Sequence, residues 1–170
     1  MTLVICDSSI LILISKLEIL DLLVDVFKEI FIPYAVYIES VEESKKLKKM
    51  DALFIEKKVN EGKIIVKKIK NLSDKQKFIE DFNIHDGEAE AIVLYFECKA
   101  NLLGTDDYQT IKLCKLLNLN YFTTLLFIHR CFENNLLLKE NALLKCDKLN
   151  AIGWYKEELI IYFKNKILRM

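Results

Sequence analysis

The sequence has little of what marks disordered, fibrous or repetitive chains. Of its 170 residues only 4 are glycine and 1 is proline, while 52% are hydrophobic. Because so much apolar surface can offset the entropy lost on folding, disorder, collagen-like repeats and low-complexity linkers are excluded. The length predicts a single domain over residues 1–170, in which residues 138–170 form a C-terminal helical extension packed on the rest.

The sequence also lacks net charge, with 25 Lys plus Arg against 25 Asp plus Glu. This balance excludes a uniformly basic coat for nucleic acid. It conceals two segments of opposite sign, because residues 45–70 hold ten Lys and three acids, whereas residues 74–107 hold nine acids and three Lys. An acidic segment beside a basic flank is what a phosphodiester-cleaving site needs, so nucleic acid is kept as a candidate substrate.

Paired cysteines and an export signal are missing as well. The five cysteines are far apart and include no Cys-x-x-Cys pair, which argues against a disulfide framework and a thiolate zinc site. The apolar stretch from Leu3 to Val26 contains five charged residues and has neither a basic start nor a small-residue cleavage site. We therefore expect a cytoplasmic protein with reduced, mostly buried thiols and no membrane span.

Short apolar runs alternate with helical patterns along the chain. The expected strands are 3–6, 30–32, 64–66, 102–103 and 121–123. The expected helices are 10–23, 34–49, 52–60, one following a capping box at Ser73–Gln76, 86–99, 108–117 and three more, the last over 155–167. This alternation, without a hairpin signal, predicts an α/β fold with a parallel sheet and helices on both faces.

Carboxylates follow the predicted strands, at the edge where open parallel sheets bind their ligands. Asp7 comes directly after the first strand, and Asp106 and Asp107 come after the fourth. Glu39 lies inside the helix expected over 34–49, six residues after Pro33, and Glu88 and Glu90 open the helix before the fourth strand. Glu88 and Glu90 are about 200° apart around a helix, so at most one of them faces a common site.

Acids gathered from four parts of the chain would repel one another unless a cation neutralised them. A hard divalent ion such as Mg²⁺ prefers oxygen ligands, and it can bridge a phosphate, activate a water and stabilise a leaving oxygen. Each acid alone also has a plainer interpretation as a helix cap or first-turn residue, and Glu39 as part of an exposed face. Their joint placement is what favours metal-assisted phosphodiester hydrolysis.

Four segments, in order, carry a family resemblance. They are Asp7-Ser8-Ser9-Ile10-Leu11, Ile32-Pro33 with Glu39 downstream, Gly87-Glu88-Ala89-Glu90-Ala91-Ile92, and Thr105-Asp106-Asp107. The set resembles the PIN domains, and most closely the VapC-like archaeal and bacterial branch with a Gly-Glu-x-Glu-Ala-Ile helix and a double Asp. The resemblance covers nearly the whole chain and implies a three-layer α/β/α fold with a small, mainly parallel sheet of about five strands.

The resemblance implies a Mg²⁺- or Mn²⁺-dependent endoribonuclease. It assigns catalytic roles to Asp7, Glu39, Glu88, Asp106 and Asp107. Among these, Asp7, Glu88 and one or both of Asp106 and Asp107 would ligate the metal. The residues that would orient these ligands or a bound water are Ser9, Thr105 and Glu90. Weak RNA contacts are expected from Lys45, Lys46, Lys48, Lys49 and Lys112. Toxin-type relatives are commonly dimers with a separately encoded inhibitor, so a homodimer and an antitoxin partner are also expected.

Other functions stay open at this point. A PIN-like scaffold whose acids only cap helices would be a non-catalytic module that binds RNA or protein. A nuclease without an antitoxin would act in RNA processing or ribosome maturation. A phosphotransferase of the haloacid-dehalogenase type is disfavoured because it needs Asp-x-Asp after the first strand, where this chain has Asp7-Ser8-Ser9. A receiver-like phospho-acceptor is disfavoured because its acid pair should follow the first strand.

Overall fold

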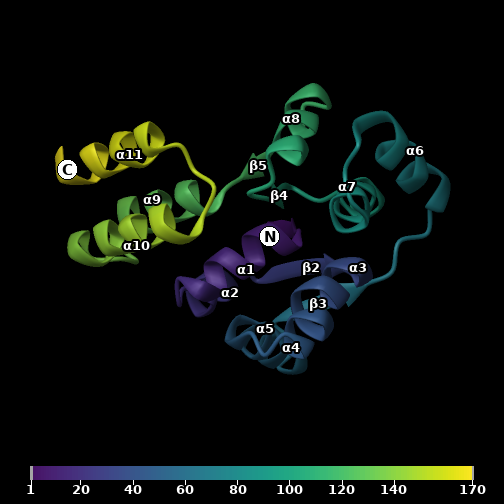
Figure 1. Ribbon diagram of the computed structural model, residues 1–170, viewed down its shortest axis with the longest axis horizontal. Helices are drawn as coiled ribbons and strands as arrows, with labels where there is room; N and C mark the ends of the chain where they lie inside the picture. Colours follow the sequence, from purple (N-terminus) through teal and green to yellow (C-terminus); the bar gives the residue numbers. More distant parts are fainter. Residues whose placement is uncertain (1, 170) are drawn as a thin grey trace. The chain divides into compact units, whose positions relative to one another are not determined.

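The computed structural model describes residues 2–169, and the chain divides into two compact units, Met1–Phe122 and Thr123–Met170. The first unit holds the sheet and the helices around it (Figure 1). The second unit consists of helices. The packing of residues 138–170 on the rest of the chain stays a prediction.

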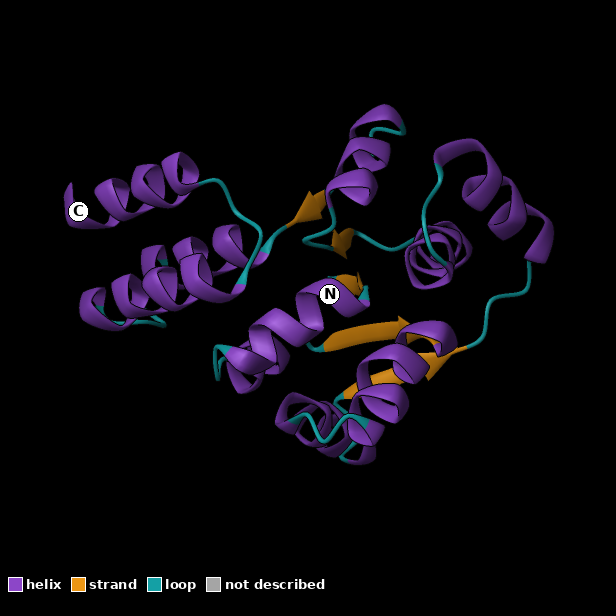
Figure 2. Ribbon diagram, viewed as in Figure 1, coloured by secondary structure: helices purple, strands orange, loops and turns teal. Residues whose placement is uncertain are grey.

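The strands of the first unit are β1 (Leu3–Cys6), β2 (Glu29–Pro33), β3 (Ile64–Lys67), β4 (Leu102–Gly104) and β5 (Tyr121–Phe122). Figure 2 shows the strands in orange. Within residues 2–169 they form one five-stranded sheet in the order β3-β2-β1-β4-β5, and each pairing is parallel. The predicted α/β fold with about five parallel strands is therefore confirmed. The order reverses between β1 and β4, which is the switch point where such sheets form a crevice beyond their carboxyl ends.

Helices cover the sheet on both faces, as right-handed connections between parallel strands require. On one face α7 (Asp86–Cys98) packs across β1, β2 and β4, and α6 (Leu72–Phe82) packs against α7. Ile5 and Leu103 join α7 and α8 (Tyr108–Leu116) in one buried cluster. The alternate residues Val4, Cys6 and Ile30 are buried on the opposite face. The connections that lead from β1 to β3, with α1 (Ser8–Lys16), α2 (Leu20–Val26) and α5 (Met50–Asn60), belong to that face.

The end of β4 is glycine because two side chains approach it closely. A Cβ atom on Gly104 would lie 2.9 Å from Cζ of Phe122 and 3.2 Å from Sγ of Cys6. The glycine therefore lets β4 and β5 lie side by side directly before Thr105.

The cysteines are free thiols, as the sequence predicts. Cys6, Cys114, Cys131 and Cys146 are buried, and Cys98 is partly exposed. Burial raises the pKa of Cys114 and of Cys131 to about 12, so these thiols are unreactive core residues.

The predicted helix over 10–23 is wrong in its continuity. The chain leaves the helix after Lys16, and Glu18 adopts a left-handed conformation with φ of 59° before α2 begins. Both helices bury apolar residues, so the apolar spacing continues across the break. The spacing alone therefore does not show that the segment contains two helices.

The predicted helix over 34–49 is also interrupted. It consists of α3 (Tyr34–Tyr37), the π-helical segment η1 (Ile38–Glu43) and α4 (Ser44–Lys46). The wider π turn re-aims the side chains that follow Tyr37, and such turns are frequent at functional sites. Glu39 lies inside it.

The predicted capping box at Ser73 is wrong. The cap of α6 is Asn71, whose side-chain oxygen accepts a hydrogen bond from the Asp74 amide at 3.0 Å. Asn is as good an N-cap as Ser, so the helix begins two residues earlier than the Ser73 box predicts.

The second unit contains α9 (Thr124–Glu133), α10 (Lys139–Ile152) and α11 (Glu157–Arg169), and each of the three packs against the other two. The last helix begins at Glu157 rather than at the expected Tyr155. Within residues 2–169 no helix is both long and apolar enough to span a bilayer.

Candidate active site

The parallel register of β1 and β4 brings two predicted site segments together. Cys6 pairs with Gly104, and the Asp7 amide donates to the Gly104 carbonyl at 3.0 Å. The residues that follow, Asp7 after β1 and Thr105 after β4, therefore lie side by side at the carboxyl edge of the sheet, at its switch point.

Asp7 is a deeply buried carboxyl group, with 1% of its surface exposed. It caps α1 by accepting from the Ile10 amide on Oδ1 at 3.1 Å. Burial raises its pKa to about 7, and the charge of Asp106 adds to the increase, while the hydrogen bonds that Oδ1 accepts from Ser9 and Ile10 act in the opposite direction. A carboxyl group in this environment is expensive to ionise unless a cation faces it.

Ser9 connects Asp7 to the end of β4. Its hydroxyl donates to Oδ1 of Asp7 at 2.6 Å and accepts from the Asp106 amide at 2.8 Å. Ser9 thus joins the segments that carry Asp7 and Asp106. The resemblance assigns Ser9 the role of orienting the metal ligands.

Asp107 is an N-cap. Its Oδ1 accepts from the amide of Thr110 at 2.7 Å and from the hydroxyl of the same residue at 2.9 Å. The Asp107 amide in turn donates to the Thr105 hydroxyl at 3.1 Å. The cap interpretation therefore accounts for one oxygen of Asp107 and leaves its role as a ligand a prediction.

Glu88 lies in the first turn of α7 and is half-buried. Burial raises its pKa, and the charges of Asp107 and Glu39 add to the increase, against its own backbone amide and His85. Glu88, Glu39 and Asp107 are therefore electrostatic neighbours that come from three separate elements.

Glu39 reaches the same region from η1. Its Oε2 accepts a hydrogen bond from the Ser8 hydroxyl at 2.7 Å. Its carboxylate also lies against the Cα of Gly87, because a Cβ placed there would be 2.6 Å from Oε2.

Glu90 points elsewhere and has structural partners. Its Oε2 accepts from the Ala35 amide at 3.1 Å, and its Oε1 forms an ion pair with Nζ of Lys75 at 2.9 Å. Lys75 also pairs with Asp86 at 2.9 Å, so it ties α6 to α7. The expected divergence of Glu88 and Glu90 on the helix is thus observed, and Glu90 connects α7 to α3 and α6.

The predicted metal-binding cluster of acids is not assembled among residues 2–169. Among residues 2–169 no group of three or more Asp, Glu, His or Cys side chains stands close enough to hold a metal ion. The physical reason is local: Asp7, Asp107 and Glu39 turn toward Ser9, Thr110 and Ser8, which relieves the repulsion between like charges.

Two carboxylate oxygens of the predicted site nevertheless have no hydrogen-bond partner among residues 2–169. In the part of the chain that the structure describes, the buried polar side-chain atoms that form no hydrogen bond are Oδ2 of Asp7, Oδ2 of Asp51, Oε2 of Glu88 and Nε2 of His129. Two of these belong to the predicted site. Buried oxygens that nothing satisfies fit a hard, oxygen-preferring cation such as Mg²⁺ or Mn²⁺.

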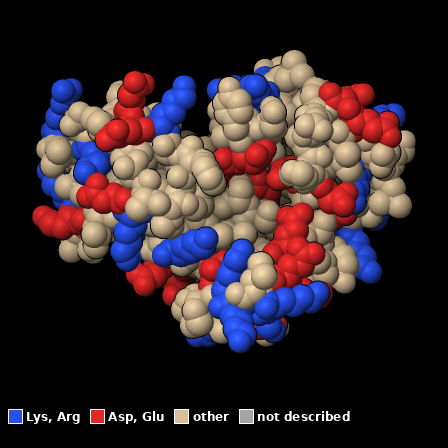
Figure 3. Space-filling view, viewed as in Figure 1, with Lys and Arg blue, Asp and Glu red and all other residues tan. Residues whose placement is uncertain are grey.

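Charge on the surface follows the two segments seen in the sequence. Figure 3 shows Asp and Glu atoms gathered over the region where Figure 1 labels β4, α7 and α3, with Lys and Arg atoms over α4 and α5. Lys45 pairs with Glu56 at 2.6 Å, and Lys112 lies over the Tyr108 ring at 4.4 Å. Lys46, Lys48 and Lys49 are exposed. Their contact with RNA stays a prediction.

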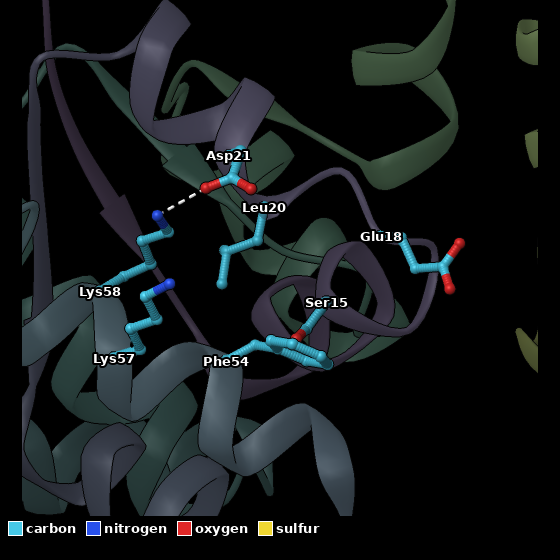
Figure 4. Close-up of a pocket in the computed structure, with 7 residues that line it drawn as sticks. All are labelled: Ser15, Glu18, Leu20, Asp21, Phe54, Lys57 and Lys58. Atoms are coloured by element: carbon cyan, nitrogen blue, oxygen red, sulfur yellow. Dashed lines mark ion pairs between the residues drawn. The ribbon is translucent and has the colours of Figure 1, made fainter.

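A separate pocket opens at the other end of α1 (Figure 4). It is lined by Ser15, Glu18, Leu20, Asp21, Phe54, Lys57 and Lys58. Lys58 pairs there with Asp21 and with Glu61. None of its seven lining residues belongs to the predicted site, so this pocket is separate from the candidate metal ligands.

The sequence interpretation missed Ser8 and Gly87. Both stand inside the motifs that carry the resemblance, beside Asp7 and Glu88. Their contact with Glu39 depends on a π turn that no local pattern signals, so only the tertiary structure reveals it.

Comparison with protein families agrees with the fold. A family model, DUF3368, described as a PIN domain, matches residues 3–166. Among solved structures, the chain is similar to the crystal structure of PAE2754 from Pyrobaculum aerophilum, with 12% identity and a TM-score of 0.49 over 65% of this chain and 85% of that one. No curated protein matches the chain.

Proposed function

This chain belongs to the PIN domain family, and on that premise we propose that it is a metal-dependent endoribonuclease that hydrolyses RNA phosphodiester bonds at the carboxyl edge of its sheet. The observation that carries the proposal is a pair of buried oxygens that have no hydrogen-bond partner among residues 2–169, Oδ2 of Asp7 and Oε2 of Glu88. Each belongs to a carboxyl group whose pKa is raised by burial. Such groups destabilise a fold unless they serve a ligand of opposite charge.

The proposed ligands are Asp7, Glu88 and one or both of Asp106 and Asp107, with Glu39 completing the set. Bound there, Mg²⁺ or Mn²⁺ supplies Lewis acidity for the phosphate and lowers the pKa of a water. Ser9 holds Asp7 against the end of β4, and Ser8 holds Glu39 near Glu88. Both hydroxyls thus orient carboxylates before a substrate arrives.

The proposed substrate is RNA, whose phosphates would be drawn to the lysines of α4 and the segment after it. Lys46, Lys48 and Lys49 are exposed there and form no ion pair within residues 2–169. Point charges of this kind position a backbone without reading its sequence.

Calorimetric titration with Mn²⁺ and a cleavage assay on labelled RNA test the proposal together. The full chain should bind Mn²⁺ below millimolar concentration and cleave RNA only in its presence. Asp7→Asn should lose both properties, whereas Asp25→Asn, at an exposed position of α2, should keep them. A fully active Asp7→Asn protein would refute the assignment.

A non-catalytic scaffold is the second candidate. The observation in its favour is that Asp7 and Asp107 both cap helices. Absence of Mn²⁺ binding, or binding unaffected by the combined loss of Asp7 and Asp106, would favour a module that only binds RNA or protein.

We further propose a homodimer in the cytoplasm that acts as the toxin of a toxin–antitoxin pair. A neighbouring reading frame that encodes a short protein with a basic DNA-binding end would support the toxin. A neighbourhood without one would favour RNA processing or ribosome maturation.

A further inference from the structure

The carboxylate of Glu39 occupies the space that a side chain at position 87 would need. A Cβ on Gly87 would lie 2.6 Å from Oε2 and 2.9 Å from Oε1 of Glu39, and real Cβ atoms do not approach oxygens so closely. Gly87 is buried and helical, so its conformation by itself does not demand glycine. The contact with Glu39 is therefore the reason why this position lacks a side chain.

The position of the same carboxylate is defined from a second side. The Ser8 hydroxyl donates to Oε2 at 2.7 Å, and the Ser44 hydroxyl donates to the backbone carbonyl of Glu39 at 3.0 Å. Ser8 is the first residue of α1, next to Asp7. Glu39 is thus held between the starts of α1 and α7.

The start of α7 favours a negative charge at this place. In the part of the chain that the structure describes, the N-cap His85 makes no side-chain cap hydrogen bond, and the aligned peptide dipoles of the 13-residue helix leave partial positive charge there. The Glu39 carboxylate lies against Gly87, the residue directly before Glu88. Two acids from different elements therefore stand at one helix end.

We propose that Gly87 and Ser8 are positioning residues for Glu39: the bare Cα of Gly87 admits the carboxylate, the Ser8 hydroxyl orients it, and together they place it beside Glu88 for a shared divalent cation. The cation rests on the function proposed above. The positioning itself is a property of the chain alone.

Alanine at position 87 should leave the fold intact. The atoms that its methyl group meets are the far end of a flexible side chain, which can move away. Alanine is also a better helix former than glycine, by about 1 kcal/mol. The substitution should therefore displace Glu39 without unfolding α7.

A double-mutant cycle on the full chain tests this, with Gly87→Ala, Glu39→Asp and the double variant. Gly87→Ala should weaken Mn²⁺ binding by about tenfold, as loss of groups that orient ligands does. Glu39→Asp withdraws the carboxylate by one methylene, so adding Gly87→Ala to it should cost nothing more. If Gly87→Ala lowers the Mn²⁺ affinity equally in the wild type and in Glu39→Asp, or lowers it in neither, the proposal is overturned.

Crystal structures of the metal-free variants separate the two proposals. In Gly87→Ala the Glu39 carboxylate should leave the start of α7, and in Ser8→Ala its Oε2 should lose its fixed direction. Ser73→Ala, an exposed serine at the start of α6, is the matched control and should leave Glu39 in place. An unmoved Glu39 in Gly87→Ala refutes the positioning role, whereas wild-type protein that binds no Mn²⁺ refutes the proposed function and leaves the displacement of Glu39 to decide the positioning.

Discussion

The hydroxyl of Ser9 donates a hydrogen bond to Oδ1 of Asp7 at 2.6 Å and accepts one from the Asp106 amide at 2.8 Å. One side chain thus joins the ends of β1 and β4 at the switch point of the sheet. Asp7 is held on one oxygen by Ser9 and Ile10, while its other oxygen has no partner among residues 2–169. Asp7 is therefore fixed through Oδ1, and its buried Oδ2 is the atom that a ligand could satisfy.

Loss of the Ser9 hydroxyl should affect both stability and metal binding. Ser9→Ala removes two hydrogen bonds, one from the Asp106 amide to Ser9 and one from Ser9 to Asp7, which should cost about 1–2 kcal/mol of unfolding free energy in urea titrations. Mn²⁺ affinity should fall about tenfold, and Ser9→Thr, which keeps the hydroxyl, should restore most of it. An affinity equal to that of Ser73→Ala would contradict this role.

Asp7→Asn should stabilise the metal-free protein while it removes activity. The pKa of Asp7 is raised from 3.8 to about 7, so the folded state binds more protons than the unfolded state between these values. The contribution of Asp7 to stability therefore falls as pH rises through that window. In the presence of a chelator the variant should exceed the wild type by about 1 kcal/mol or more near pH 8, and this difference should shrink toward about pH 4. A variant less stable than the wild type near pH 8 would argue against a buried, ionised Asp7.

Lys75 and Lys77, both on α6, should differ sharply in their contribution to the unfolding free energy. Lys75 pairs with both Glu90 and Asp86, whereas Lys77 is exposed and pairs with Asp74 at 3.8 Å. Lys75→Met leaves the buried Glu90 without its cation and should cost about 2–4 kcal/mol of unfolding free energy. Lys77→Met should cost less than about 0.5 kcal/mol, because exposed pairs contribute little. Equal costs in chemical denaturation would show that the pairs of Lys75 do not connect α6 to α7.

The lysines near α4 should set the salt dependence of RNA binding. Replacing Lys46, Lys48 and Lys49 with Gln should reduce the slope of log K against log salt by about 2, since each phosphate contact to a single strand contributes roughly 0.7. In a cleavage assay KM should rise while kcat stays unchanged. The control replaces Lys16, Lys77 and Lys115, which are exposed elsewhere. If both triple variants bind RNA alike, the lysines of α4 have no special role.

His129 should make the second unit sensitive to acid. Burial lowers the pKa of His129, and Lys166 and Arg130 lower it further, against Glu133. Its Nε2 is buried without a hydrogen-bond partner in the described part of the chain, and the ring meets Phe163 edge-on at 5.1 Å. The folded state binds fewer protons, so stability present above the usual value near 6.5 is lost as pH falls below it. His129→Leu should remove this loss in denaturant titrations at decreasing pH, whereas His85→Leu, at an exposed position, should not.

Much of the fold could be predicted because its signals are local. The apolar run 3–6 and the acid that follows it specify β1 and the cap of α1 with only a few residues. The break at Glu18 and the π turn around Glu39 could not be predicted in this way. Each is imposed by packing against elements distant in the chain, and the apolar pattern continues through both.

The amino-acid sequence by itself determined the parallel α/β architecture, the strand ends at which Asp7 and Asp106 stand, and the family motifs, because apolar period, caps and residue order are properties of neighbouring residues. Only the tertiary structure decided which acids meet. It directs Glu90 to Lys75 and Ala35, brings Glu39 onto Gly87 and Ser8, and leaves one oxygen each of Asp7 and Glu88 without a partner among residues 2–169. Those outcomes depend on the direction in which each helix leaves the sheet, and that direction follows from the packing of the whole unit.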